Sequence, residues 1–317
     1  MYPAMYRDNM FARTGMYQAA LKVYIRNTWD WVLVDLRKSD ADYIDHHCKN
    51  YKECVPTLQK RGKKWFLDFV FQTAVKLPDA KIQNTRILAV DLGLNSACTC
   101  SVITPESAVL GREFLSLPRE YDSLEHVISH IKHAQRLCAR QTPGLWKQAK
   151  GINDDIEVKT AQFIVDTAIK YDVDCIVMEH LDLAGKNRGS KKQRLHLWRA
   201  KYVQSVAADK AHRNLIRVAR VCACNASRLA FDGSGRVMRG KEAELPSYSL
   251  CRFPTEKQYN CDLNASYNIG SRYYIWELLK PLPVTAGQAV TAKVPELAHR
   301  SQCTLSSLIK LNAVLAA

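Results

Sequence analysis

Two short apolar runs that each end in an acidic residue constrain the fold of this chain more than any other feature. Residues 87–90 (ILAV) lead directly into Asp91, and residues 175–178 (CIVM) lead directly into Glu179. Strands with consecutive apolar residues are typical of a sheet that is buried on both faces. The sequence therefore predicts an α/β fold with a mixed sheet flanked by helices.

The segments around these runs predict the order of the other elements. Short connections between three β-prone segments indicate an antiparallel meander, with strands at residues 87–91, 97–103 and 108–114. Apolar residues at helical spacing predict helices at residues 121–140, 154–171 and 193–214. Pro143-Gly144 is expected to end the first of these helices, and Asp154 and Asp155 suit the first turn of the second.

A third acid, Asp262, opens a helix predicted to run to about residue 279. Because 88 residues separate Asp91 from Glu179 and 83 separate Glu179 from Asp262, only folding can unite them. A meander, helices, a parallel strand, a further strand and a closing helix form the RNase H-like order. In that order the strands of Asp91 and Glu179 are neighbours, and the helix brings Asp262 beside them.

Carboxylates in this arrangement are suited to phosphodiester hydrolysis with two hard cations about 3.5–4 Å apart. We therefore expect Asp91, Glu179 and Asp262 to be catalytic and to bind Mg²⁺ or Mn²⁺. Each acid alone has an ordinary alternative, since an Asp at a strand end often forms a turn and Asp262 could cap its helix. The combination of the three acids is the specific signal.

The charge of the chain points to a polyanionic partner. Lys and Arg number 46 against 31 Asp and Glu, which gives a net charge of +15. A basic protein without such a partner is the alternative. The odd number of cysteines (11), the absence of a leader and the lack of a membrane-spanning run predict a reduced, cytoplasmic protein with no membrane partner.

A basic cluster directly after Glu179 is expected to track a nucleic-acid backbone, although it could be only a solvated surface. It comprises Lys186, Arg188, Lys191, Lys192, Arg194, Arg199 and Lys201. Arg228, in a turn-rich insertion at residues 223–261, is a candidate for contact with the scissile phosphate.

The N-terminal region is predicted to be rich in β-strands. A hairpin is expected from residues 21–26 and 29–36, and residues 65–71 (WFLDFVF) form a further β-prone run after a basic turn. The aromatic side chains of this run could form a stacking surface for nucleic acid or the core of a small barrel. Both readings can hold on opposite faces of one strand.

Three runs in order resemble the RuvC motifs of the TnpB (OrfB) proteins of insertion sequences, which are considered ancestral to type V CRISPR effectors. They are ILAVDLGLN at 87–95, IVMEHL at 176–181 and YNCDLNASYNI at 259–269. Similarity extends from about Pro56 to near the C-terminus and includes GSKKQRL at 189–195 and AFDGSG at 230–235. The resemblance implies an endonuclease that cuts target DNA under the guidance of an RNA transcribed from the end of the element.

The resemblance also implies a domain plan: a shortened β-rich, wedge-like domain at residues 1–85, a RuvC-like nuclease domain at 86–280 and a C-terminal tail at 281–317. The sequence departs from the family in its cysteines. Members usually carry two Cys-x-x-Cys pairs that hold zinc, whereas here Cys222, Cys224, Cys251 and Cys261 stand at other spacings. We therefore predict no structural zinc.

Three functional classes remain open. The first is the RNA-guided DNA endonuclease that the resemblance implies. The second is a nucleic-acid-binding derivative, or an accessory factor in transposition, that does not cleave. The third is an RNase H-type nuclease that needs no guide.

Overall fold

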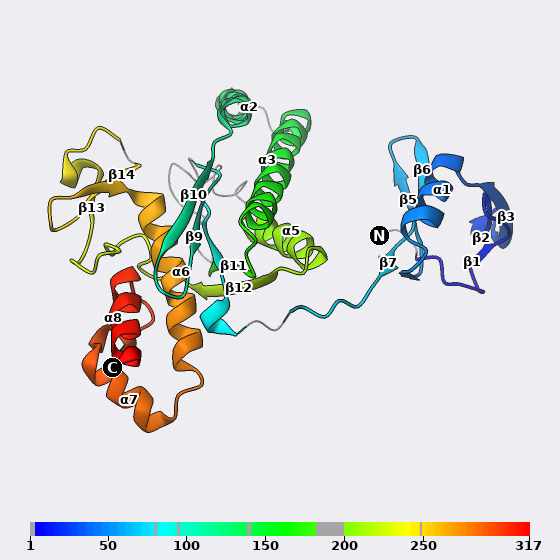
Figure 1. Ribbon diagram of the computed structural model, residues 1–317. Helices are drawn as coiled ribbons and strands as arrows, with labels where there is room; N and C mark the ends of the chain where they lie inside the picture. The colour runs from blue at the N-terminus through cyan, green and yellow to red at the C-terminus, as the bar shows by residue number, and fades with distance from the viewer. Residues whose placement is uncertain (1–3, 79–80, 94–95, 138–140, 182–199, 248) are drawn as a thin grey trace. The chain divides into compact units, whose positions relative to one another are not determined.

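The computed structural model describes residues 4–78, 81–93, 96–137, 141–181, 200–247 and 249–317 (Figure 1). The chain divides into two compact units, Met1–Val75 and Lys76–Ala317. In the described part of the chain, every helix is too short or too polar to cross a membrane.

The first unit is built from small antiparallel sheets and one helix. β1 (Phe11–Arg13), β2 (Gln18–Ile25) and β3 (Thr28–Asp35) form one sheet, and β4 (Lys52–Glu53) pairs with β7 (Phe71–Gln72). The predicted β2–β3 hairpin is confirmed, and its turn places Arg26 and Asn27 at positive φ. The helix α1 (Lys38–His47) was not predicted, because it buries only Ala41 and its sequence has a weak apolar pattern.

A second hairpin in this unit, β5 (Thr57–Arg61) and β6 (Lys64–Asp68), carries the aromatic run. Trp65 and Phe66 are 59% and 40% exposed, and the cations of Lys60 and Arg61 lie over their rings. Leu67 and Phe69 pack instead against the core of the unit. Trp65 and Phe66 are thus the exposed aromatic residues of this run, and Leu67 and Phe69 are its core residues.

The second unit contains a five-stranded sheet in the order β10-β9-β8-β11-β12. Its strands are β8 (Ile87–Asp91), β9 (Cys98–Ile103), β10 (Val109–Leu115), β11 (Cys175–His180) and β12 (Arg217–Cys222). The first three form the predicted antiparallel meander, and β11 lies parallel to both β8 and β12. The sheet is mixed, as the sequence predicted.

Helices cover both faces of this sheet (Figure 1). Along β8, Ile87 and Ala89 pack on the side of α6 (Cys261–Leu279), and Leu88 and Val90 pack on the opposite side. The opposite side is covered by α3 (Pro143–Lys170) and α5 (Ala200–Arg213), and α2 (Pro118–Arg136) packs on α3. The consecutive apolar residues of β8 thus reflect burial on both faces.

The predicted start of α3 is wrong. We expected a helix from residue 154 after a break at Pro143-Gly144, but α3 begins at Pro143, so Asp154 and Asp155 lie well inside it. Proline lacks the N–H group that the first turn leaves unpaired, and its fixed φ suits the first helical position. The Pro-Gly pair therefore precedes a helix here instead of separating two.

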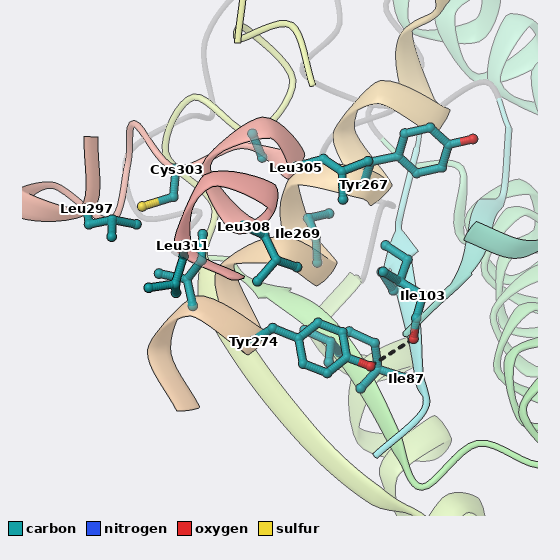
Figure 2. Packing of buried hydrophobic residues seen from close by; sticks show 14 of the residues in the cluster. Ile87, Ile103, Tyr267, Ile269, Tyr274, Leu297, Cys303, Leu305, Leu308 and Leu311 are labelled. Carbon is teal, nitrogen blue, oxygen red and sulfur yellow. Dashed lines mark hydrogen bonds between the residues drawn. The ribbon is translucent and has the colours of Figure 1, made fainter. Parts of the chain in front are cut away.

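The C-terminal segment completes the core on the α6 side. It consists of α7 (Val284–Lys293), a 3₁₀ turn η3 (Pro295–Ala298) and α8 (Leu305–Ala316). Leu305, Leu308 and Leu311 of α8 pack against α6, and Tyr274 of α6 donates a hydrogen bond to the carbonyl of Ile103 (2.8 Å; Figure 2). Residues 281–317, expected as a tail, belong to the second compact unit.

Gly270 sets the distance between α6 and the sheet. A Cβ atom at this position would lie 2.6 Å from Ile103 Cδ1 and 3.0 Å from Ala89 Cβ. We expect Gly270→Val to lower the free energy of unfolding by about 2–3 kcal/mol, because the helix would have to move off the sheet. Denaturant unfolding measures this change.

The matched control is Gly287→Ala in α7, where nothing lies within 4 Å of the added Cβ. We expect this variant to gain about 0.5–1 kcal/mol from helix propensity. Equal stabilities of the two variants would contradict the close packing at Gly270.

Candidate active site at the carboxyl edge of the sheet

The structure places Asp91 and Glu179 side by side. Val90 and Met178 are in register on the parallel strands β8 and β11, and the two acids occupy the next position of each strand. Alternation along a strand places both acids on the face that α6 covers, as it does Ala89. Two acids 88 residues apart in sequence thus meet at one edge of the sheet.

Asp262 lies in the first turn of α6, on the same side of the sheet. Asn260 caps this helix, and its Oδ1 accepts hydrogen bonds from the N–H groups of Asp262 and Leu263 (2.9 Å each). The cap is therefore Asn260 and not Asp262, and the helix begins at Cys261. The Asp262 carboxylate is thus free of the ordinary capping role considered for it above.

Burial raises the pKa values of all three carboxyl groups, and repulsion by the other two acids adds to the rise at Asp91. Burial raises the pKa of Asp91 well above its usual range, and the charges of Glu179 and Asp262 raise it further. Burial raises the pKa of Glu179 to about 7, although the Arg272 guanidinium lowers it. Burial also raises the pKa of Asp262. The three groups form one electrostatic cluster in which the ionised form is disfavoured.

Arg239, on β13 (Met238–Arg239), is a functional candidate that the sequence reasoning missed. Its positive charge lowers the pKa values of both Asp91 and Asp262. Its Nε and Nη2 atoms are buried without a hydrogen-bond partner among the described residues. A buried guanidinium with two unused donors beside carboxylates can bind a phosphate oxygen.

Thr99 also borders the cluster. It is the register partner of Asp91 on β9, and its buried hydroxyl has no hydrogen-bond partner in the described chain. No local pattern in the sequence marks either residue, since one Arg in an insertion and one Thr in a strand are common. Only the fold distinguishes them.

The chemistry of the three carboxylates fits a hard divalent cation. Their donor atoms are all oxygen, and their raised pKa values mark negative charge that a cation would compensate. Within the described ranges, no three His, Cys, Asp or Glu side chains converge closely enough to hold a metal ion together. Mg²⁺ keeps several of its waters, so it needs few protein ligands.

Two asparagines of α6 hold the turn-rich insertion in place. Asn264 accepts a hydrogen bond from Phe231 N (2.8 Å) and donates one to Leu229 O (2.8 Å). Asn268 donates to Ala226 O (2.9 Å) and to Leu229 O (2.8 Å). The insertion also contains a small sheet of β13, β14 (Leu250–Arg252) and β15 (Gln258–Asn260), with the 3₁₀ turn η2 (Gly240–Ala243). The hydrogen bonds of Asn264 and Asn268 hold residues 226–231 of the insertion against α6.

Most of the predicted nucleic-acid contacts lie outside the described residues. These are Lys186, Arg188, Lys191, Lys192, Arg194 and Arg199. Lys201 is exposed in the first turn of α5, and Arg228 is exposed in the insertion. Neither is among the charges that shift the pKa values of the three carboxyl groups. The role of this set stays a prediction.

The four cysteines considered for zinc differ in their surroundings. Cys222 and Cys224 are exposed, whereas Cys251 and Cys261 are buried and their thiols contact each other. The contact lowers the pKa of Cys251 and raises that of Cys261. The absence of a structural zinc ion stays a prediction.

No protein-family model and no curated protein sequence matches this chain. Solved structures do match it, among them two Cas12f complexes and one AacC2c1 complex. The Cas12f1–sgRNA–target DNA complex is 15% identical, with 84% of this chain and 68% of that chain covered and a TM-score of 0.47. The CRISPR-Cas12f ternary complex is 15% identical over 84% of this chain and 62% of that chain, with a TM-score of 0.43.

The third match is the crystal structure of the AacC2c1–sgRNA binary complex. It is 10% identical, with 86% of this chain and 55% of that chain covered and a TM-score of 0.51. At this identity the match concerns the fold, so the chain shares its mixed α/β fold with AacC2c1. The chain spans only about half of the length of that protein.

Proposed function

We propose that this protein is a metal-dependent endonuclease of the RNase H-like (RuvC) class that is guided by RNA to a DNA target. One observation carries the proposal: Asp91 and Glu179 lie side by side near the carboxyl ends of neighbouring parallel strands, and the charge of Asp262 acts on Asp91. Three carboxylates that repel one another at a sheet edge destabilise the folded protein unless they serve a cation. The motif resemblance and the fold shared with AacC2c1 support the guided class.

In the proposed mechanism, Asp91, Glu179 and Asp262 would hold Mg²⁺ or Mn²⁺. Such ions, when bound, would supply activation of a water and stabilisation of the leaving oxygen. Gln204 of α5 donates a hydrogen bond to the backbone carbonyl of Glu179 (2.7 Å), which fixes the end of β11. The unused donors of Arg239 bind a phosphate oxygen of the strand to be cut.

The guide is an RNA encoded by the insertion sequence that carries the gene, as the resemblance to TnpB implies. The basic surface of the chain, with a net charge of +15, binds the backbones of the guide and of the target. Association with a transposable element would place the protein in the cytoplasm, beside the nucleoid.

The test is to purify the full chain from its native context and to sequence the RNA that accompanies it. We expect a single RNA species that maps beside the gene, and cleavage of DNA complementary to its variable end in Mg²⁺. Cleavage that proceeds equally after removal of the RNA would identify a guide-independent nuclease. RNA binding without any cleavage would identify a silent derivative.

A further inference from the structure

A groove runs along β12 on the side of α6. One cavity of about 420 Å³ is lined by residues of β12 up to Cys222, by Trp276 of α6 and by Arg300. A second cavity of about 590 Å³ continues it towards the start of β12 at Arg217, and both cavities share Lys280. We call the two cavities together the β12 groove.

β12 is an edge strand of the sheet (Figure 1). Residues of β12 line both cavities, so the groove lies beside this edge. The cations that line the groove outnumber its carboxylates. The cations are Arg217, Arg220, Lys280 and Arg300, together with the buried Arg272, which already donates to backbone carbonyls; the carboxylates are Asp174 and Glu277. Asp174 is already engaged, because its Oδ2 accepts a hydrogen bond from Arg86 N (2.8 Å).

An aromatic side chain stands among these cations. Trp276 is 44% exposed, and the Arg300 guanidinium lies 3.5 Å from the centroid of its ring. Stacked planar groups of this kind provide a platform for a nucleobase, and neighbouring cations bind the phosphates. Lys280 and Arg300 are both exposed, so their charges can reach a bound backbone.

We infer that the β12 groove binds a single-stranded segment of nucleic acid, with one base on the Trp276–Arg300 stack and phosphates at Lys280 and Arg300. The inference rests on the proposed function, and it names a contact with the same class of partner away from the three carboxylates. A duplex is excluded as the occupant of the stack, since its bases are already stacked on each other.

The direction of the groove supports this occupant. One end of the groove lies at Cys222, the last residue of β12. The residue before it, Val221, is the register partner of Glu179. A strand that follows the groove along β12 therefore leads towards the strand end that carries Glu179. An apolar peptide paired with the edge of β12 would make no favourable electrostatic interaction with the cations at both ends of the groove.

The test measures binding of a fluorescein-labelled oligothymidylate of about 15 nucleotides by anisotropy. The full chain is used in EDTA at several salt concentrations. We expect Trp276→Leu to weaken binding about tenfold, because base stacking on one aromatic ring contributes that much. Lys280→Gln and Arg300→Gln together should flatten the slope of log K against log salt by about 1.4. The control is Lys132→Gln, an exposed charge on α2.

A second measurement locates the strand without relying on variants. An oligonucleotide that contains 5-bromodeoxyuridine should crosslink under ultraviolet light to the peptide that contains Trp276. Affinity and slope unchanged from the control, or crosslinks only elsewhere, would overturn the inference, as expected if the groove holds a polypeptide. Binding of free thymidine monophosphate by a protein that does not bind the oligonucleotide would assign the groove to a free nucleotide and also overturn the inference.

These outcomes are separable from those for the proposed function. Binding in EDTA involves no cleavage, so the groove can be confirmed even if the protein never cuts DNA. Conversely, metal-dependent cleavage that depends on the three carboxylates can stand while the groove variants bind like the control.

Discussion

Asp91→Asn is expected to lower the rate of DNA cleavage by about a thousandfold or more. We expect the same loss of rate from Glu179→Gln and from Asp262→Asn. Each carboxylate is proposed to hold a cation whose stabilisation of the transition state is worth several kcal/mol. Affinity for nucleic acid should change little, because Lys and Arg side chains supply the contacts with the backbone. Single-turnover cleavage and anisotropy, measured on the same preparations, separate the two quantities.

The metal site also has a readout that does not depend on cleavage. Burial raises the pKa of Glu179 from 4.5 to about 7, so the folded protein disfavours its ionised form. This lowers the free energy of unfolding as the pH rises from 4.5 to 7, and the loss is complete above pH 7. Without divalent ions at pH 8, the free energy of unfolding of Glu179→Gln should therefore be about 2–3 kcal/mol higher than that of the wild type.

The gain of Glu179→Gln should shrink as the pH falls towards 4.5, where the wild-type carboxyl is protonated in both states. Mg²⁺ at about a hundred times its Kd should stabilise the wild type by about 2.7 kcal/mol and the variant much less. Wild-type cleavage by the triple variant of Asp91, Glu179 and Asp262, or equal stabilisation of wild type and Glu179→Gln by Mg²⁺, would refute the assignment.

Arg272→Met should lower the free energy of unfolding by about 3–5 kcal/mol. The Arg272 side chain is 4% exposed in α6 and donates hydrogen bonds to four backbone carbonyls. These belong to Cys222 (2.6 Å), Cys224 (2.9 Å), Ser301 (3.1 Å) and Cys303 (3.1 Å). Methionine fills similar space but leaves all four carbonyls without this donor.

The segments that Arg272→Met destabilises can be located, in addition to the change in the free energy of unfolding. Hydrogen exchange in Arg272→Met should rise at residues 222–224 and 301–303, because one guanidinium ties both segments to α6. Arg300→Met is the matched control, since Arg300 is exposed and its loss should cost less than about 1 kcal/mol. Similar stabilities of the two variants would show that the buried hydrogen bonds contribute little.

The sheet could be predicted from the sequence because its residues are buried on both faces. Apolar runs that end in Asp91 and Glu179 have few alternatives, and the meander follows from short connections. Helix boundaries were harder to predict. Pro143-Gly144 reads as a break, and only packing of the segment before residue 154 shows that a helix already starts there.

The candidate site was predictable only in part. The three acids stand out because strand ends and helix starts can be read from local patterns. Arg239 could not be found in this way, since its relevance depends on the insertion folding back over the acids. The hydrogen bonds of Asn264 and Asn268 hold that insertion, and they connect positions more than 30 residues apart. Most of the basic cluster at residues 186–201 lies outside the described residues.

The packing of α8 against α6 has a consequence for synthesis on the ribosome. Asp262 is held against the sheet by α6, and the core on that side is completed by Leu305, Leu308 and Leu311. A nascent chain therefore lacks the assembled carboxylates until residues 305–311 have been synthesised and have left the ribosome, because domains fold as units during synthesis. If the carboxylates cut DNA as proposed, a chain whose synthesis stops before α8 has no assembled site with which to cut.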